Sequence, residues 1–376
     1  MGISLRFELP NDYLNNSTSL DKDTQYLRRC AQLAIFGDGR VRDNPRVGAV
    51  LVYQDRIIGE GYHQVAGQAH AEVNCLASVC SEDRGLVRES TLYISLEPCC
   101  ITGRSGACTD LIRREGIQTV VFAQRDPTPG VAGESVRLLE EAGIVVREYP
   151  DFNPTKLPNA HRHTLVTRHR PYVVLKYARS TDGFVRPADR GAAYWITHPL
   201  SRRLVHRWRA NTSAILVGAR TVLEDNPSLT TRLFPGPTPR PVIIDLRNRC
   251  TGKEKLFGGS GERPLVFASR ARPELAAEVM VLGEDLNRKA LTQVLGKLKE
   301  QRLGEVTVEG GATLLNAFIT AGLWDEARVF TGNIRFGSGL PAPRLPGSAA
   351  MAWGKIVGTD RLEVFKNVAP EDGDAR

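Results

Sequence analysis

One histidine, one glutamate and two cysteines in the first half of the chain have the types and spacing of a hydrolytic zinc site. His70 and Glu72 are separated by one residue, Cys99 follows a proline, and Cys108 lies nine positions further on. A catalytic zinc needs three protein ligands and one open position for water, from which it makes hydroxide available near neutral pH. His70, Cys99 and Cys108 would supply the ligands, and Glu72 would move protons beside the metal without binding it. An H-x-E pattern followed by P-C is typical of zinc-dependent deaminases of nucleobase-like amines.

The same cluster has two interpretations without catalysis. A structural zinc site would need a fourth ligand, which Cys100 could supply, although adjacent cysteines rarely bind one ion. The cysteines could also be a chance cluster. Eight residues separate Cys99 from Cys108, whereas only two separate the cysteines in deaminases of nucleic acids. The longer spacing argues against the deaminases of nucleic acids and of free nucleosides that have the short spacing.

Composition and charge describe an ordinary globular protein. The 376 residues are 41% hydrophobic and 24% charged, and the length is sufficient for two domains. No apolar run reaches the roughly 20 residues that would span a bilayer, and the polar N-terminus lacks a signal-peptide pattern, so we expect a cytoplasmic protein with no membrane partner. The net charge of +8 favours acidic partners. These would be phosphorylated metabolites, or nucleic acid if the protein were an RNA-editing deaminase.

The seven cysteines are an odd number with irregular spacing, which is a poor disulfide framework. Four of them lie apart from the cluster and are interpreted as isolated buried thiols: Cys30, Cys75, Cys80 and Cys250.

Apolar periodicity predicts alternating strands and helices in both halves. In the first half, helices are expected over 22–36, from residue 70, and over 109–116 and 133–143, with strands over 48–63 (turning near 54–55), 90–98, 119–123 and 144–149. In the second half, helices are expected over 199–210, 287–300 and 313–321, with strands over 172–178, 214–218, 241–245, 264–269, 305–311 and 326–332. The segment 150–171 is rich in proline and basic residues, so we place the junction near 168–171, between domains 1–168 and 169–376. Both domains are predicted to be α/β.

The second half has one weak chemical motif. Residues 308–311 (VEGG) end a predicted strand and precede a helix, an arrangement that can bind phosphate or pyrophosphate but is more often only a turn. Taken alone, Trp195 is interpreted as a core residue, Arg209 as a charge on a helix surface and Arg232 as a charge in a loop.

Together these segments resemble the bifunctional riboflavin biosynthesis deaminase–reductase family. In the first half the resemblance lies in residues 44–52, 59–74, 92–100 and 125–133, and in the second in residues 171–183, 194–197, 206–232 and 308–311. It implies a cytidine-deaminase-like α/β/α domain followed by a dihydrofolate-reductase-like α/β domain that uses NADPH. It implies that His70, Cys99 and Cys108 hold one zinc ion and that Glu72 is catalytic.

The resemblance also implies a substrate and the residues that bind it. The enzyme would deaminate 2,5-diamino-6-ribosylamino-4(3H)-pyrimidinone 5′-phosphate and then reduce the ribosyl group to ribityl, as a homodimer formed through the reductase domain, with no nucleic-acid partner. Asn44 and His63 would line the deaminase pocket, although His63 could also be a core or turn histidine. Lys176 would lie near the reacting centre of the reductase. The reductase substrate would contact Arg209, Leu229, Arg232 and Glu309. NADPH would contact Ala178, Trp195, Thr221, Asp225, Gly311, Ala312 and Thr313.

The chain departs from the family pattern in places. Between Cys99 and Cys108 the family has His-x-Gly-Arg/Lys-Thr-Pro-Pro, where this chain has Ile101, Gly103, Arg104, Ser105, Gly106 and Ala107. Arg104 and Ser105 keep a cation and a hydroxyl that could hold a phosphate. In the second half, Phe184 replaces a basic residue and Ala193 a serine. The alternatives are therefore a related enzyme with only one active half, a nucleic-acid adenosine deaminase, and a non-catalytic protein with structural zinc.

Overall fold

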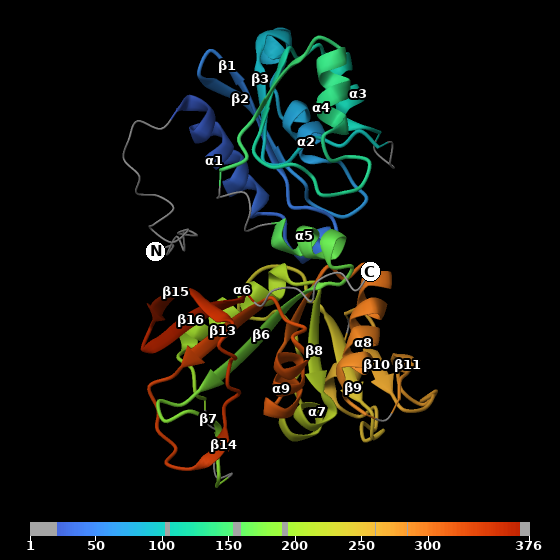
Figure 1. The fold of residues 1–376 in the computed structure, drawn as a ribbon, viewed down its shortest axis with the longest axis vertical. Helices are drawn as coiled ribbons and strands as arrows, with labels where there is room; N and C mark the ends of the chain where they lie inside the picture. Colours follow the sequence, from blue (N-terminus) through green and yellow to red (C-terminus); the bar gives the residue numbers. More distant parts are fainter. Residues whose placement is uncertain are drawn as a thin grey trace. The chain divides into compact units, whose positions relative to one another are not determined.

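The computed structural model describes residues 21–101, 106–152, 159–189, 195–259, 261–283 and 285–368. The chain divides into two compact units, residues 1–168 and residues 169–376. Figure 1 colours the first unit from blue to green and the second from green to red. None of the helices in the described ranges combines the length and apolarity that crossing a membrane requires.

A mixed five-stranded sheet forms the centre of the first unit. Its order is β2-β1-β3-β4-β5; β1 is antiparallel to both β2 and β3, whereas β3, β4 and β5 run parallel. The predicted hairpin turn forms at Gln54 and Asp55, whose φ angles of 43° and 63° suit a two-residue turn between twisted strands. The elements are α1 (Lys22–Ala34), η2 (Gly39–Val41), β1 (Gly48–Tyr53), β2 (Arg56–Tyr62), α2 (Ala71–Ala77), η3 (Ser81–Glu89), β3 (Thr91–Ile94), α3 (Cys108–Glu115), β4 (Thr119–Phe122), α4 (Glu134–Glu141), β5 (Val145–Glu148) and α5 (Ala160–Thr167).

Helices cover both faces of this sheet, because alternate residues of each strand point to opposite sides. Leu51 and Phe122 belong to the buried cluster that includes α2, α3 and α4. Val50 and Val121 belong to a second cluster that includes Leu27 of α1. The first unit is therefore a three-layer α/β/α structure, with α1 on one face of the sheet and α3 and α4 on the other (Figure 1).

A nine-stranded sheet forms the centre of the second unit, in the order β11-β10-β9-β8-β12-β6-β13-β16-β15. Neighbouring strands from β11 to β13 are parallel, whereas β16 is antiparallel to both β13 and β15. A separate two-stranded sheet pairs β7 with β14. The elements are β6 (Tyr172–Arg179), β7 (Phe184–Pro187), α6 (Pro199–Asn211), β8 (Ala214–Gly218), α7 (Ala219–Asp225), β9 (Arg240–Asp245), η6 (Lys255–Phe257), β10 (Leu265–Ala268), β11 (Glu278–Val281), α8 (Arg288–Glu300), β12 (Glu305–Val308), α9 (Ala312–Ala321), β13 (Glu326–Thr331), β14 (Gly339–Pro341), β15 (Ala349–Val357) and β16 (Asp360–Asn367).

The two faces of the larger sheet are also covered by different helices. On one face, α8 and α9 form a buried cluster that contains Leu175 and Phe318. On the other face, α6 contributes Val205 to a cluster with Phe330 of β13, and α7 packs in a third cluster. Because Leu175 faces α8 and α9, the next residue, Lys176, faces the α6 side of the sheet.

Several features differ from the sequence-based expectations. Helix α5 lies inside the segment 150–171, which the sequence presents only as a junction, and β15 and β16 form where no strand is predicted. Most residues of β15 are exposed, so the strand lacks the apolar alternation that would reveal it and depends on pairing with β16. Cys80 is exposed rather than buried. The other three isolated cysteines are buried as expected: Cys30, Cys75 and Cys250.

Candidate zinc centre and candidate reductase site

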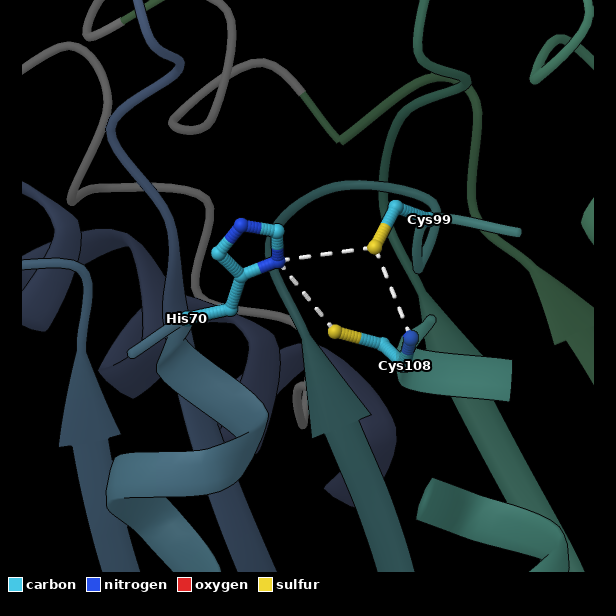
Figure 2. Close-up of side chains that lie close together, drawn as sticks. All are labelled: His70, Cys99 and Cys108. Carbon is cyan, nitrogen blue, oxygen red and sulfur yellow. Dashed lines mark hydrogen bonds between the residues drawn. The ribbon is translucent and has the colours of Figure 1, made fainter. Parts of the chain in front are cut away.

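The side chains of His70, Cys99 and Cys108 meet in the first unit (Figure 2). His70 Nδ1 lies 3.4 Å from Cys99 Sγ and 3.3 Å from Cys108 Sγ, and the three ligand atoms all lie within 4.8 Å of one another. A tetrahedral zinc ion at about 2.0 Å from nitrogen and about 2.3 Å from sulfur would separate these atoms by roughly 3.6 Å. Imidazole and thiolate are also ligand types that zinc prefers. The three side chains therefore fit a zinc ion.

Three local structures bring these ligands together. His70 immediately precedes α2 with an extended backbone, Cys99 follows Pro98 in the loop after β3, and Cys108 begins α3. The prediction that a helix begins close to Cys108 is confirmed. The Cys108 backbone N–H donates to Cys99 Sγ at 3.4 Å, so the start of α3 directs a donor at this sulfur and favours its thiolate form.

The sulfur atoms of Cys99 and Cys108 titrate as a pair. A hydrogen bond from the Cys108 thiol lowers the pKa of Cys99 to about 4, and the same bond raises the pKa of Cys108. The hydrogen bond with Cys99 also raises the pKa of His70. The lowered pKa of Cys99 favours its thiolate, which is the form that binds metal.

Glu72 lies in the first turn of α2 and is only 3% exposed. Burial raises its pKa above the usual value, and the charge of Cys99 raises the pKa further. A carboxyl group with a raised pKa is suited to accept and release a proton near neutral pH. The structure thus places next to the three ligands the chemical group that the sequence assigns to proton transfer.

Asn44 and His63 form a hydrogen-bonded pair close to His70. Asn44 Nδ2 donates to His63 Nε2 at 3.0 Å, and His63 Nδ1 donates to the carbonyl oxygen of Ala69 at 3.0 Å. The centre of the His63 ring lies 5.5 Å from that of His70, with the rings edge to face. Burial lowers the pKa of His63, which keeps the ring neutral as this pairing requires. Both predicted pocket residues therefore lie beside the zinc candidates.

In the second unit, Arg209 and Glu309 form a buried ion pair with two hydrogen bonds. Arg209 Nε lies 3.2 Å from Glu309 Oε1, and Arg209 Nη2 lies 2.8 Å from Oε2. The two side chains are 13% and 11% exposed, and Arg209 Nη1 also donates to the carbonyl oxygen of Thr230 at 3.2 Å. The interpretation of Arg209 as a solvated surface charge is wrong, because a carboxylate from a distant segment pairs with it.

Lys176 and His206 act on the same pair electrostatically, and Arg232 acts on His206. Burial alone would raise the pKa of Glu309, but the charges of Arg209 and Lys176 outweigh it and lower that pKa to about 2. Burial lowers the pKa of Lys176. Burial also lowers the pKa of His206 to about 4, and the charges of Arg209 and Arg232 lower it further. The cluster therefore holds several cations and a neutral imidazole around one carboxylate.

His206 is a residue of this cluster that the sequence analysis misses. Its Nδ1 accepts a hydrogen bond from the Arg232 backbone N–H at 2.9 Å, so α6 holds the loop that carries Arg232. A signal was available, since His206 lies three positions before Arg209 and shares its face of α6. In the same loop, Leu229 has a φ of 51°, which is uncommon for a residue with a side chain. The Leu229 side chain is buried in the cluster beside α7.

Some of the residues expected to contact NADPH lie close together at the start of α9. The Gly311 backbone N–H donates to Thr221 Oγ1 at 3.0 Å, which links the turn before α9 to α7. Ala312 and Thr313 form the first turn of α9, where backbone N–H groups that lack helical partners can bind phosphate. The chemistry of this turn fits a phosphate-containing cofactor.

The other residues expected to contact NADPH lie on three different segments of the second unit. Ala178 lies two residues beyond Lys176 on the same face of β6, and Asp225 is exposed at the end of α7. Trp195 is 68% exposed, so its interpretation as a core residue is wrong. Its ring instead lies beside Arg202, whose guanidinium carbon is 4.5 Å from the ring centre. Four residues singled out by the sequence lie outside the described residues: Gly103, Arg104, Ser105 and Ala193.

Comparison with known proteins identifies both units. Residues 20–124 match the cytidine and deoxycytidylate deaminase zinc-binding region, and residues 171–356 match the RibD C-terminal domain. The chain is 35% identical to the riboflavin biosynthesis protein RibD of Aquifex aeolicus over 85% of this chain and 89% of that protein. It is 33% identical to the RibD protein of Escherichia coli over 91% of this chain and 93% of that protein. The chain belongs to the RibD family.

Solved RibD structures agree with this assignment. A diaminohydroxyphosphoribosylaminopyrimidine deaminase/5-amino-6-(5-phosphoribosylamino)uracil reductase from Thermotoga maritima is 35% identical, with a TM-score of 0.83 over 92% of this chain and 99% of that chain. RibD of Acinetobacter baumannii is 30% identical, with a TM-score of 0.81 over 92% of this chain and 98% of that chain.

Family membership confirms several sequence-based predictions. This chain is a bifunctional riboflavin biosynthesis enzyme with a zinc-binding, cytidine-deaminase-like domain. Its second domain is a RibD reductase domain of the NADPH-dependent kind, with a dihydrofolate-reductase-like fold. The predicted fold class, the two activities and the two cofactors are thus confirmed.

Proposed function

We propose that residues 1–168 deaminate 2,5-diamino-6-ribosylamino-4(3H)-pyrimidinone 5′-phosphate, and that residues 169–376 reduce the ribosyl group of the product to ribityl. The observation that carries the proposal is the convergence of one imidazole, two cysteine sulfurs and a buried carboxyl group, in a chain that continues into a RibD reductase domain. The Thermotoga maritima relative is both a deaminase and a reductase.

In the deaminase half, we assign His70, Cys99 and Cys108 to the metal and Glu72 to proton transfer. Bound zinc would supply a water molecule of lowered pKa. Glu72 would take a proton from this water and return protons to the pyrimidine ring and to the departing ammonia, so that one water is consumed for each ammonia released. Asn44 and the neutral His63 would orient the pyrimidine.

In the reductase half, the buried cluster would hold the substrate while NADPH supplies the hydride. Arg209 and Arg232 provide cations for the substrate phosphate. Lys176, buried and with a lowered pKa, would hold the proton that accompanies the hydride. Glu309 would hold the Arg209 side chain in position through the two hydrogen bonds that it accepts from the guanidinium.

The remaining substrate and cofactor contacts are proposed for two further groups of residues. The Leu229 segment would contact the substrate. NADPH would lie against Ala178, Trp195, Thr221, Asp225, Gly311, Ala312 and Thr313.

The decisive experiment compares ammonia release and NADPH oxidation by the zinc-loaded protein and by its Glu72→Gln variant. We expect wild-type protein to perform both reactions. The variant should keep its zinc, release no ammonia, and still oxidise NADPH when given substrate that is already deaminated. Glu82→Gln, an exposed carboxylate in the same unit, is the matched control and should behave as wild type. A zinc-loaded wild type that releases no ammonia would refute the deaminase assignment.

We also propose a homodimer formed through the reductase domain. Strand β15 is an edge of the nine-stranded sheet, and it exposes Met351 and Ile356, which are 52% and 68% accessible. Exposed apolar side chains on an edge strand favour pairing with another chain. Sedimentation equilibrium should give twice the chain mass, and a Met351→Lys, Ile356→Lys variant should shift the protein toward the monomer.

A further inference from the structure

Helix α5, the last element of the first unit, contacts the loop that carries Asn44. The side-chain amide of Asn159 pairs with the backbone of Arg46: it accepts from the Arg46 N–H at 2.8 Å and donates to the Arg46 carbonyl at 3.0 Å. His161 Nε2 donates to the carbonyl oxygen of Asn44 at 2.9 Å. Asn159 and His161 are 6% and 2% exposed. Three hydrogen bonds from these two buried side chains therefore join α5 to two residues of one short loop.

The Asn159 side chain bonds to the loop and does not cap its own helix. Asn159 occupies the N-cap position of α5, where an asparagine side chain ordinarily accepts a hydrogen bond from the first turn. In this helix the side chain makes no capping bond, because its amide is directed at Arg46. Helix stability alone does not account for this arrangement, whereas a requirement to hold the loop does.

Arg162 extends the contact to a second loop. Its guanidinium donates to Thr128 Oγ1 at 2.6 Å and to the carbonyl oxygen of Asp43 at 3.5 Å. Thr128 in turn hydrogen-bonds to Asp126, in the loop that follows β4. One turn of α5 thus bridges the loop of residues 43–46 and the loop after β4.

The loop of residues 43–46 leads directly to the zinc candidates. The side chain of Asn44, whose backbone carbonyl is bound by His161, donates to His63. His63 in turn donates to the carbonyl oxygen of Ala69, the residue before His70. An uninterrupted series of hydrogen bonds therefore connects α5 with the chain segment that presents the first metal ligand.

We propose that Asn159 and His161 are positioning residues of the deaminase, which hold the backbone of the 43–46 loop so that the Asn44 side chain faces the pyrimidine. This inference rests on the proposed deaminase function. Each acts through the backbone of the loop that carries Asn44, His161 at Asn44 and Asn159 at Arg46, rather than by touching the substrate. Loss of either contact therefore weakens substrate binding and leaves the metal site and the reductase unchanged.

The first test uses three single variants and steady-state deamination kinetics. His161→Leu removes the bond to Asn44, and we expect its KM for the pyrimidine to rise about tenfold, as the loss of one buried hydrogen bond would produce, with a smaller change in kcat. His161→Gln places an amide N–H near the position of Nε2 and should restore the KM. His163→Leu makes the same substitution at an exposed histidine of the same helix and is the matched control. Zinc content and reduction of pre-deaminated substrate should be unchanged in all three.

The second test does not depend on activity. Asn159→Ala removes no capping bond from α5 but deprives the Arg46 N–H of its acceptor, so hydrogen exchange at the Arg46 amide should accelerate by about tenfold or more. Unchanged exchange, or a His161→Leu enzyme with wild-type KM, would overturn the proposal, as would a KM that glutamine does not restore. An inactive wild type with accelerated exchange in Asn159→Ala would instead refute the proposed deamination while showing that α5 holds the loop.

Discussion

Replacing Glu309 by glutamine should destabilise the second unit by about 3 kcal/mol at pH 7. The neighbouring Arg209 and Lys176 charges overcome the effect of burial and lower the pKa of Glu309 from an ordinary 4.5 to about 2. At about 1.4 kcal/mol for each pH unit, this lowering of the pKa corresponds to roughly 3 kcal/mol. Removing one partner of a buried ion pair costs a similar amount, about 3–5 kcal/mol. Both figures describe the loss of the carboxylate charge beside the buried Arg209 and Lys176 side chains.

The sign of the pH dependence follows from the direction of the shift. The pKa of Glu309 is lower in the folded protein than in the unfolded chain, so the carboxylate contributes its full stabilisation above about pH 4.5. That contribution is lost as the pH falls toward about 2. The difference in unfolding free energy between wild type and Glu309→Gln should therefore be largest near neutral pH and should shrink steadily between about pH 5 and pH 2.

Urea denaturation followed by tryptophan fluorescence is the assay, because all four tryptophans of the chain lie in the second unit: Trp195, Trp208, Trp324 and Trp353. Glu300→Gln is the control, since Glu300 is 63% exposed and pairs with Lys297 only at the surface. We expect this control to change stability by less than about 0.5 kcal/mol. A Glu309→Gln protein with the stability of the control, or a difference from wild type that does not vary between pH 5 and pH 2, would refute the reasoning.

Three further substitutions separate the roles of the two units. Cys99→Ala should abolish zinc binding, which atomic absorption measures. The variant should also lower the unfolding temperature of the first unit, because metal binding contributes to folding. Full zinc occupancy in the variant would contradict the assigned ligand set. Lys176→Met should slow NADPH-dependent reduction by at least about 10²-fold, while the rate of ammonia release stays unchanged. Equal loss of both activities would point to misfolding of the variant. Arg232→Ala should raise the KM for the phosphorylated reductase substrate by about 10–100-fold and spare deamination; an unchanged KM would remove Arg232 from the phosphate site.

The zinc centre could be predicted from the sequence because its geometry is mostly local. His70 and Glu72 lie at the start of one helix, Cys99 lies in the loop that follows a strand, and Cys108 begins the next helix. Strand ends and helix starts on one edge of an α/β sheet lie close together by the nature of the fold. Residue types and spacing therefore predicted the ligand set that the structure brings within reach of one metal ion.

Helix α5 illustrates what local patterns do not reveal. Its sequence lies in a proline-rich, basic segment, and its contacts join residues 113 and 117 positions apart. The N-cap Asn159 is a local helix-start signal, but its side chain is used for a distant backbone instead. Only the folded chain shows that this segment holds the Asn44 loop.

The sequence by itself determined the residue types of the zinc site, the alternation of strands and helices, and the family to which the chain is similar. The tertiary structure decided which charges are buried and which are solvated. Arg209 pairs with Glu309 across 100 positions, His206 orients the Arg232 backbone from 26 positions away, and Trp195 faces solvent rather than the core. The physical reason is that the burial and pKa of a charged group depend on partners brought close by folding, which neighbours in sequence do not specify.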